Sequence, residues 1–471
     1  MMRGKTGGTR SAGAPGTMRE RIREQPSCGR MLVATSVLAG LVAAGASALA
    51  EDHVTLPPPV ENLPVLKLSL AEAIEAALDK SPNVRLFREK IEAARAASRT
   101  QLGTMLPNIS ATGKYNEQTF FFGSIGGRPV RSDPFDIVDG RASVSQSIFS
   151  LSLIERWRAS RSALQAAELD AAATENDTVA RVALNYFEVL RNQETLNART
   201  ANVGLYEDLV AFVTSRQAGG MATGLDTARL ESQLENERQR LELAKGEVER
   251  AKFTLLNSIG IGYSIALQLT DDMKVYHGLI PSLEGAMDAA GANRPELKAQ
   301  LQRIRTAELS LRSVKGERLP SLLAEGNYGL IGRKFDSNTA TYNVGATLSI
   351  PIFDGGQREG RIGQSASEFN QENYKLAVVQ NQIGMEVRDA LITLKAAVEQ
   401  QRIAENGLKA SLKELSLAQE RIRMLSSNTL ELSNALFSIV RAKDNMIDAL
   451  FRVNASRVNL ARAQGQVEML K

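Results

Sequence analysis

The stretch SIPIFDGGQREGRIGQ, residues 349–364, marks a change from one kind of secondary structure to another. An alternating apolar segment reaches Pro351-Ile352-Phe353, two glycines follow at Gly355-Gly356, and residues 357–425 then contain no proline. Alternation is typical of a strand, whereas a long proline-free run with apolar residues at helical steps indicates a helix. The stretch therefore predicts a corner at which a strand turns into a very long helix.

A second corner of the same kind lies upstream in SQSIFSLSLIERWRAS, residues 145–160, where Ile148-Phe149 corresponds to Ile352-Phe353. Further positions match between the two halves of the chain: Leu70 with Leu283, Pro82 with Pro295, Leu225 with Leu430, and Gly260 with Gly465. We interpret the chain as a duplication. Its expected parts are a leader at 1–50, an extended lead-in at 51–65, a first repeat at 66–269, a connector at 270–280 and a second repeat at 281–471.

Each repeat shows the same order of patterns: a helix, two alternating strands and a hairpin of two long helices. The strands are expected near residues 108–118 and 140–149 in the first repeat, and near 321–331 and 341–351 in the second. The helical hairpins are expected at 151–260 and 356–467, and a Gly/Asp/Pro-rich loop at 120–138. Helices of about 65 residues span roughly 100 Å, which is the scale of a coiled coil.

The strands carry one apolar and one polar face. In NISATGKYN, residues 108–116, one face holds Ile109, Ala111, Gly113 and Tyr115, and the other holds Ser110, Thr112, Lys114 and Asn116. Strands of about ten residues fit a tilted membrane-spanning β-strand. Open strand edges are unfavourable in lipid, so four strands need further copies to complete them, and three copies would close twelve strands.

The corners gather residues suited to the edge of a membrane. We expect Phe149 and Phe353 to lie at the membrane interface, where aromatic side chains accumulate. Pro351 ends strand pairing because it has no N–H to donate, and Gly355 and Gly356 permit the bend.

The leader carries the basic excess of the chain. The whole sequence has a formal charge of +4, but residues 1–50 hold seven Lys/Arg against two Glu, which leaves 50 basic and 51 acidic residues elsewhere. Nucleic-acid binding is therefore not expected. The basic segment and the apolar run at 31–50, ending in Ala48-Leu49-Ala50, predict a cleaved secretory signal peptide, with a membrane-anchoring helix as the alternative. The single cysteine, Cys28, precedes the apolar run.

The duplicated strands, the PIFDGG corner and the coiled hairpins resemble the TolC-like outer-membrane efflux protein family over about residues 66–471. The resemblance implies a mainly α fold with β: a homotrimeric channel-tunnel, with a 12-stranded β-barrel in the outer membrane of a Gram-negative-type cell and a long periplasmic α-helical barrel. It implies passive export of drugs, metals or proteins, with outer-membrane lipid, a periplasmic adaptor and an inner-membrane RND pump or ABC exporter as partners. Some relatives are lipidated at a mature N-terminal cysteine, and this chain resembles the unlipidated branch.

The resemblance also assigns roles to the helix ends. Matching GMATGLD (220–226) and SSNTLELSNA (426–435) to the tips of the family places Asp226, Glu431 and Asn434 at the pore constriction, where three copies of Glu431 would form a cation-attracting ring. An ordinary solvated helix charge is the alternative. Arg421 and Arg423 stand beside the positions of the family's closing residues, which are Ile422 and Ser427 here. The expected adaptor contacts are Gly219, Gly220, Met221, Thr223, Gly224, Leu225, Ser426, Ser427, Asn428 and Thr429.

Catalysis finds little support in the sequence. The two histidines, His53 and His277, lie far apart, and Asp271-Asp272 is expected to be a solvated pair. The glycines after Asp354 lack the Walker spacing and its Lys-Ser/Thr. We therefore expect no enzyme, no metal site and no cofactor. The alternative function is that of a soluble periplasmic or secreted coiled-coil protein with a structural or adhesive role, which gives no reason for four alternating strands.

Overall fold

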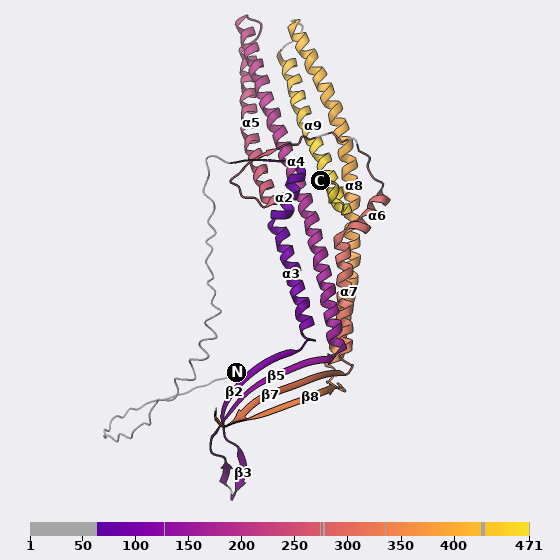
Figure 1. The fold of residues 1–471 in the computed structure, drawn as a ribbon. Helices are drawn as coiled ribbons and strands as arrows, with labels where there is room; N and C mark the ends of the chain where they lie inside the picture. The colour runs from indigo at the N-terminus through magenta and orange to yellow at the C-terminus, as the bar shows by residue number, and fades with distance from the viewer. Residues whose placement is uncertain are drawn as a thin grey trace, which may run out of the picture. The chain divides into compact units, whose positions relative to one another are not determined.

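The computed structural model describes residues 64–126, 128–273, 275–276, 278–334, 336–424 and 429–470. The chain divides into two compact units, Met1–Pro59 and Val60–Lys471. The expected signal peptide, Cys28 and both histidines lie outside the described residues, and everything that follows concerns the second unit. Its elements are drawn in Figure 1.

The helices alternate between short and very long ones. In chain order they are α2 (Leu70–Lys80), α3 (Pro82–Gly103), α4 (Leu151–Ala218), α5 (Gly224–Ile259), α6 (Leu283–Asn293), α7 (Pro295–Gly316), α8 (Gln357–Arg423), α9 (Thr429–Gln464) and the 3-10 helix η1 (Val467–Leu470). At ~1.5 Å per residue, α4 and α8 are each about 100 Å long. Among the described helices, none combines enough length with enough apolar character to cross a membrane.

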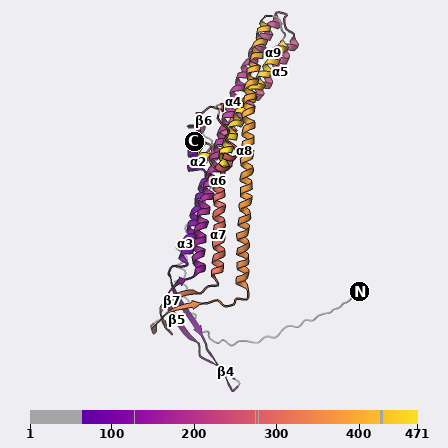
Figure 2. The same ribbon diagram turned by 90° about the vertical axis from the view of Figure 1, so that its right-hand side faces the viewer.

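The long helices form two hairpins that are joined side by side. α4 packs against α5, α8 packs against α9, and α4 also contacts α9. Toward the sheet, α3 packs on α4, and α7 packs against both α4 and α8 (Figures 1 and 2). α4 therefore has described neighbours on several sides, whereas α8 lies at the edge of the single chain.

Four antiparallel strands form one sheet in the order β2-β5-β7-β8. They are β2 (Asn108–Gln118), β5 (Phe135–Phe149), β7 (Ser321–Gly332) and β8 (Asn338–Ser349). In the sheet, β2 and β8 each have a strand neighbour on one side only. β5 starts before the expected residue 140, and β8 ends before Pro351.

The expectation of a loop at 120–138 was wrong. This segment contains a second antiparallel pair, β3 (Phe121–Ile125) and β4 (Arg128–Arg131), before β5 begins at Phe135. Two of the glycines that suggested a loop lie at the irregularity and the turn of this short hairpin: Gly123 and Gly126 have positive φ, at 113° and 58°. Pro129 lies within β4, opposite Ser124. A hairpin of such short strands leaves too little alternation to be recognised in sequence.

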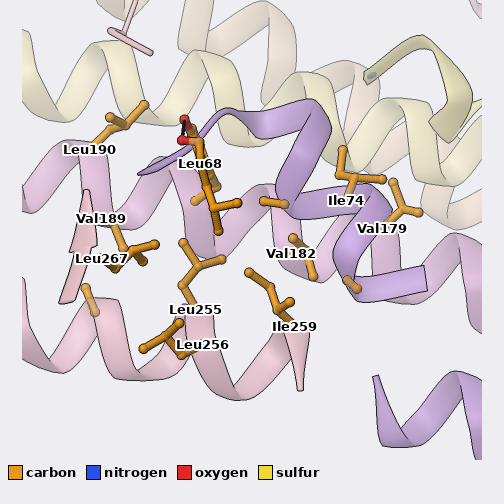
Figure 3. Close-up of a cluster of buried hydrophobic side chains, with 14 of the residues drawn as sticks. Leu68, Ile74, Val179, Val182, Val189, Leu190, Leu255, Leu256, Ile259 and Leu267 are labelled. Carbon is orange, nitrogen blue, oxygen red and sulfur yellow. Dashed lines mark hydrogen bonds between the residues drawn. The ribbon is translucent and has the colours of Figure 1, made fainter. Parts of the chain in front are cut away.

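A parallel strand pair ties the start of the first repeat to its end. β1 (Val65–Leu68) pairs with β6 (Ala266–Leu269), a pairing that sequence alternation did not reveal because each strand has four residues. Around it lies an apolar core of α2, α4 and α5 side chains, among them Ile74, Val182 and Leu255, which are fully buried (Figure 3). Further apolar clusters join α6, α8 and α9, and the four long helices near their far ends.

The duplication is visible in the order of elements. α2, α3, β2, β5, α4 and α5 are followed by α6, α7, β7, β8, α8 and α9 in the same sequence. The matched glycines have matched roles: Gly260 ends α5 with φ 86° against Lys80 of α2, and Gly465 follows α9 with φ 70° against Arg294 after α6. A Cβ at Gly260 would lie 2.7 Å from the Lys80 carbonyl oxygen, so both conformation and space require glycine there.

Candidate functional site

One face of the four-stranded sheet is apolar and uncovered by the chain. The row Ile109, Val144, Gly326 and Val344 crosses all four strands in register. On the same face, Tyr328 pairs with Tyr342, and Leu322 pairs with Leu348. Tyr342 and Val344 are 78% and 80% exposed, values far above those of core residues. A contiguous exposed apolar face of this kind indicates a surface that meets lipid or another protein.

The opposite face is polar. The next row across the sheet consists of Ser110, Ser143, Asn327 and Asn343. On this face the guanidinium of Arg141 forms an ion pair with Asp139 at 3.3 Å and donates to the side-chain oxygen of Asn327 at 2.7 Å. Because successive side chains point to opposite faces of a strand, the sheet separates an apolar surface from a hydrated one.

The first corner joins β5 to α4 through Ser150 alone. The Ser150 side chain accepts a hydrogen bond from the Leu153 N–H and so caps the helix. The buried Ser152, the second residue of α4, contacts Ser313 of α7: the Ser313 hydroxyl donates to the Ser152 carbonyl at 2.8 Å. A Cβ at Gly316 would lie 3.1 Å from the Ser152 nitrogen, so the two helices approach closely there. This corner is held by close packing.

The second corner is longer and open to solvent. Residues 350–356 separate β8 from α8, and Gly355 and Gly356 adopt φ of 69° and 84°. Among the residues of this segment, Ile352 and Phe353 are 92% and 86% exposed, and Phe149 of the first corner is 48% exposed. The two glycines therefore make the bend, as the sequence indicated, because left-handed φ is unfavourable for residues with a Cβ.

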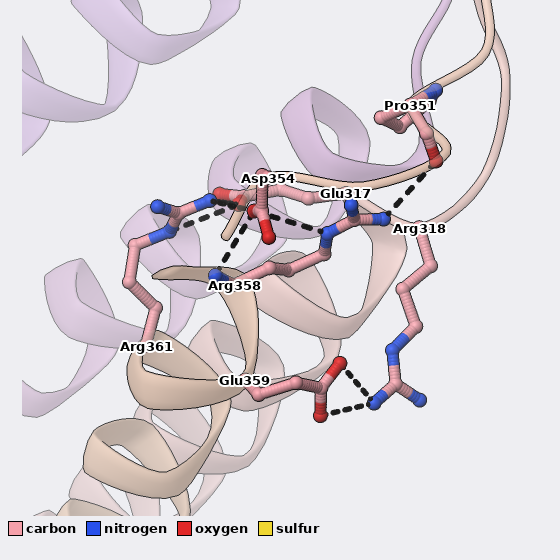
Figure 4. Close-up of polar contacts among 7 residues, drawn as sticks. All are labelled: Glu317, Arg318, Pro351, Asp354, Arg358, Glu359 and Arg361. Atoms are coloured by element: carbon pink, nitrogen blue, oxygen red, sulfur yellow. Dashed lines mark hydrogen bonds and ion pairs between the residues drawn. The ribbon is translucent and has the colours of Figure 1, made fainter. Parts of the chain in front are cut away.

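A network of charged side chains, which includes the buried Arg358, holds the second corner (Figure 4). The Asp354 carboxylate accepts from the Arg358 N–H at 3.0 Å and so caps α8, while the Arg358 guanidinium donates to the Pro351 carbonyl at 3.4 Å. Two ion pairs then join α8 to the residues that follow α7. They are Arg361 with Glu317 at 2.7 Å, and Glu359 with Arg318 at 2.7 Å.

At the far end of the first hairpin, the chain turns through Gly219 and Gly220, and Gly220 has φ 74°. Thr223 caps α5, and Asp226 completes a reciprocal capping box: its carboxylate accepts from the Thr223 N–H at 3.0 Å and from the Thr223 hydroxyl at 2.7 Å. These hydrogen bonds lower the pKa of Asp226. Met221, Thr223, Gly224 and Leu225 are all exposed. The structure thus gives Asp226 a capping role that sequence matching did not predict.

Residues 425–428, between α8 and α9, lie outside the described residues, and with them the expected contact residues Ser426, Ser427 and Asn428. Thr429 begins α9, Glu431 stands in its first turn, and Asn434 is exposed one turn further on. Glu431 forms an ion pair with Arg421 near the end of α8. Ile422 is buried between the helices. One apolar cluster, containing Leu209, Leu230, Ile422 and Leu436, joins all four long helices here and holds the two tips together.

Asp271 and Asp272 are both exposed, as expected of a solvated pair, but Asp271 also has a structural role that was not predicted. Its side-chain oxygen accepts from the Leu70 N–H at 2.8 Å and from the Tyr186 hydroxyl at 2.7 Å, which anchors the start of α2 to α4. Burial and this carboxylate raise the pKa of Tyr186. The partners are more than 80 residues away, so the local sequence carried no signal. Within the described ranges, no group of three or more His, Cys, Asp or Glu side chains is placed to hold a metal ion.

Comparisons with known proteins agree with this arrangement. A family model described as "Outer membrane efflux protein" matches residues 73–261 and 286–466, one segment in each repeat. The chain is 24% identical over 456 residues to the outer membrane efflux protein BepC of Brucella suis, covering 94% of this chain and 91% of the relative. It is 25% identical to the outer membrane protein OprJ of Pseudomonas aeruginosa, covering 85% of each.

Solved structures share the fold. The CmeC outer membrane channel of Campylobacter jejuni superposes with a TM-score of 0.74 at 16% identity, covering 84% of this chain and 85% of that one. The outer membrane protein VceC of Vibrio cholerae gives 0.72 at 17% identity, covering 84% and 96%. These findings favour an outer-membrane efflux duct over a soluble coiled-coil protein. The chain belongs to the outer membrane efflux protein family.

Proposed function

We propose that three copies of this chain form one export duct. The observation that carries the proposal is the four-stranded sheet, which has two unpaired edges, β2 and β8, and one exposed apolar face. Joining β8 of one copy to β2 of the next leaves no free edge in lipid, and twelve strands enclose a channel lined by the polar face. The leader, residues 1–50, is removed on export in this proposal.

The exposed side of α8 supports assembly through the helices. Its exposed apolar residues recur at steps of four and then seven residues: Tyr374, Val378, Met385 and Ile392. Such a spacing forms the seam of a coiled coil, which buries it against a second helix. In the single chain α7 and α9 contact α8, and this stripe remains open. A helix of the neighbouring copy is the partner that closes a ring.

We propose that the constriction of the duct lies at the helix ends, with Glu431 as its principal charge. Glu431 stands in the first turn of α9 and is balanced by Arg421 of the same copy. Asp226 remains charged, because the hydrogen bonds from Thr223 lower its pKa, and in this proposal it adds a second acidic position held in the capping box. Asn434 adds a neutral polar group one turn beyond Glu431. Opening then requires the Arg421–Glu431 pair to rearrange between the two helices it joins.

The tips are proposed to contact a periplasmic adaptor that connects the duct to an inner-membrane RND pump or ABC exporter. The exposed Met221 and Leu225 give the first tip apolar contact area beside a rigidly capped helix. The proposal assigns the same contact to Ser426, Ser427, Asn428 and Thr429 of the second tip by the resemblance alone. Energy would come from the inner-membrane partner, and the duct itself would conduct drugs, metals or proteins passively.

Single-channel recording in planar lipid bilayers tests the duct and its constriction together. We expect uniform, cation-preferring steps from the wild-type protein, and a loss of cation preference in Glu431→Gln, because the ring of three carboxylates becomes neutral. Glu231→Gln is the matched control, since this exposed acid lies on α5 near the other tip. Unchanged selectivity in Glu431→Gln would remove the assignment of Glu431, and no steps from the wild type would contradict the duct.

A further inference from the structure

The β3–β4 hairpin extends the sheet at the end opposite the helices (Figure 1). β2 leaves α3 at Asn108 and ends at Gln118, and the hairpin follows before β5 returns. Its base is closed by two hydrogen bonds: the Phe120 N–H donates to the Ser132 hydroxyl at 2.7 Å, and the Ser132 N–H donates to the Phe120 carbonyl at 2.8 Å. The hairpin is thus an ordered continuation of the strands on their outer side.

Three consecutive phenylalanines in this hairpin are exposed. Phe121 and Phe122 are 69% and 70% exposed, and Phe120 at the base is 52% exposed. The strand register shifts between Phe121 and Gly123, so Phe122 is the extra residue of a bulge. Exposed phenylalanines side by side are unfavourable in water, which indicates that something apolar covers them in the native setting.

The charge of the hairpin is uniformly positive. Residues 119–132 contain Arg128 and Arg131 and no acidic residue. Both arginines are exposed, and neither forms an ion pair with any residue that the structure describes. Arg131 stands opposite Phe121 in the strand register, so a cation and an aromatic ring occupy one cross-strand pair.

The neighbouring loop adds further cations. The guanidinium of Arg333 lies 5.6 Å from the ring centre of Phe135, and this ring lies 5.3 Å from that of Phe120. This stack connects the loop between β7 and β8 to the base of the hairpin. Lys334 beside it is exposed. The acids of this region, such as Asp133 and Asp136, lie outside the hairpin, and Asp136 accepts from the Tyr115 hydroxyl at 2.8 Å.

We propose that the β3–β4 hairpin binds the anionic, phosphate-bearing headgroups of the outer leaflet. Phe121 and Phe122 enter the boundary of the acyl chains, and Arg128 and Arg131 bind lipid phosphate. Guanidinium groups match phosphate oxygens in geometry and charge, and basic residues next to a bilayer are attracted to anionic lipid.

A second copy of the hairpin fits this surface less well than lipid does. Three hairpins meeting over the channel would bring six arginines together with no acidic residue inside the hairpins themselves, and like charges in contact repel. An anionic lipid surface neutralises the same arginines while it covers the phenylalanines. The proposal rests on the strands crossing the outer membrane, and it does not depend on the constriction or on the adaptor.

A tryptophan reporter tests the proposal. The chain has one tryptophan, Trp157 on α4, so Phe122→Trp in a Trp157→Phe background reports on the hairpin alone. The protein is reconstituted in nanodiscs of phosphatidylcholine, with or without phosphatidylglycerol, and quenched with acrylamide. We expect phosphatidylglycerol to shift the emission to the blue and to lower the quenching constant, and high salt or Arg128→Gln/Arg131→Gln to abolish most of that change.

Tyr342→Trp in the same background is the matched control, because this residue lies on the apolar face of β8. The tryptophan of this control should be shielded from acrylamide in both lipid compositions. If it were quenched, the strands would not lie in the bilayer, and the proposed duct itself would be contradicted. With the control shielded, equal quenching of Phe122→Trp in both lipids overturns the headgroup proposal. Strong quenching of Phe122→Trp in both lipid compositions would exclude lipid contact. Weak quenching in both compositions that the arginine substitutions leave unchanged would indicate that another copy of the chain covers the hairpin.

Discussion

The two corners solve the same problem by different means. At the first corner, β5 passes into α4 through one capping serine, and α4 packs so closely on α7 that a Cβ at Gly316 would lie 3.1 Å from the Ser152 nitrogen. At the second corner, α8 starts after two left-handed glycines and is held by a cap and ion pairs around Asp354, Arg358 and Arg361. The first corner thus relies on close packing of two helices. The second relies on a network of charged side chains, in which Arg358 is buried and the outer ion pairs are exposed.

The difference follows from position within the chain. α4 contacts α3, α5, α7 and α9, so its start is enclosed and close packing is available to fix it. β8 and α8 are the outer elements of the single chain, and their free sides await a neighbouring copy in the proposed assembly. In the proposed assembly the second corner lies next to a neighbouring copy. Exposed ion pairs at such a boundary can persist through small movements of the backbone. The first corner is therefore expected to respond to volume, and the second to backbone conformation and salt.

The largest effect is expected from Gly316→Val at the first corner. The new Cβ would lie 3.1 Å from the Ser152 nitrogen and force α7 away from α4. We expect the free energy of unfolding to fall by about 2 kcal/mol, as for overpacked cores. Denaturant unfolding of the detergent-solubilised protein, followed by circular dichroism, measures it. Gly363→Val in α8 is the control, because no atom lies within 4 Å of its Cβ position. Equal losses in both variants would contradict close packing as the cause.

A smaller loss is expected from Gly356→Ala at the second corner. Gly356 has free space around its Cβ position but a φ of 84°, so alanine is opposed by backbone conformation alone. The expected loss is about 1 kcal/mol. Gly360→Ala, four residues further into α8 and also in open space, should instead stabilise the helix by up to about 1 kcal/mol. Thermal unfolding of the two variants measures both effects. Midpoint temperatures that shift in the same direction would contradict a conformational origin of the bend.

The ion pair between Arg361 and Glu317 should contribute less than either glycine. Both side chains are partly exposed, and such pairs typically contribute about 0.5 kcal/mol. A double-mutant cycle of Arg361→Gln and Glu317→Gln measures the coupling, which should shrink as salt is added. The hydroxyls of Ser152 and Ser313 at the first corner lie 3.2 Å apart, and the matching cycle of Ser152→Ala and Ser313→Ala should show a coupling that salt leaves unchanged. If the coupling free energy depended on salt at both corners, or at neither, the proposed difference between the two corners would be contradicted.

The smallest effect is expected at the first tip and depends on pH. Hydrogen bonds from Thr223 lower the pKa of Asp226 below that of the unfolded chain, about 3.9. The folded state therefore gains stability above that unfolded pKa, and the gain is lost as the pH falls through the lower folded pKa. Hydrogen exchange in the first turn of α5, corrected for intrinsic rates, should accelerate on acidification below about pH 4. Asp226→Asn keeps an accepting oxygen but has no titrating group, so hydrogen exchange in the first turn of α5 should not accelerate on acidification in this variant.

The sequence predicted the elements that repeat over long distances. Alternation in residues 109–115 identified β2 and its two faces, and the proline-free runs identified α4 and α8, because each pattern persists over many residues. The left-handed glycines Gly355 and Gly356 were also predictable, since few residues other than glycine suit a strand that turns abruptly into a helix. These features depend on local composition and periodicity, which a single sequence contains.

The features that were missed depend on distant partners or on short segments. β1 and β6 pair across 200 residues, and the β3–β4 hairpin is too short to show periodicity. The ion pair of Arg421 with Glu431 joins two helices across an intervening turn, and the bond of Tyr186 to Asp271 links helix and connector. Asp226 was matched to a pore position by resemblance, yet its capping role follows from Thr223 three residues earlier, a signal that was available in the sequence.

The proposed duct requires the sheets of three copies to pair edge to edge, and disulfide crosslinking tests this pairing directly. In a Cys28→Ser background, Ser110→Cys on β2 is combined in turn with Thr341→Cys, Asn343→Cys or Thr347→Cys, which share one face of β8. Ser143→Cys with Asn327→Cys is the control, because these residues already pair within one chain. Under oxidation we expect at least one β2–β8 pair to give covalent dimers and trimers on non-reducing gels, and the control to stay monomeric. If the control pair forms its disulfide but every β2–β8 pair gives only monomers, a barrel built from three copies would be contradicted.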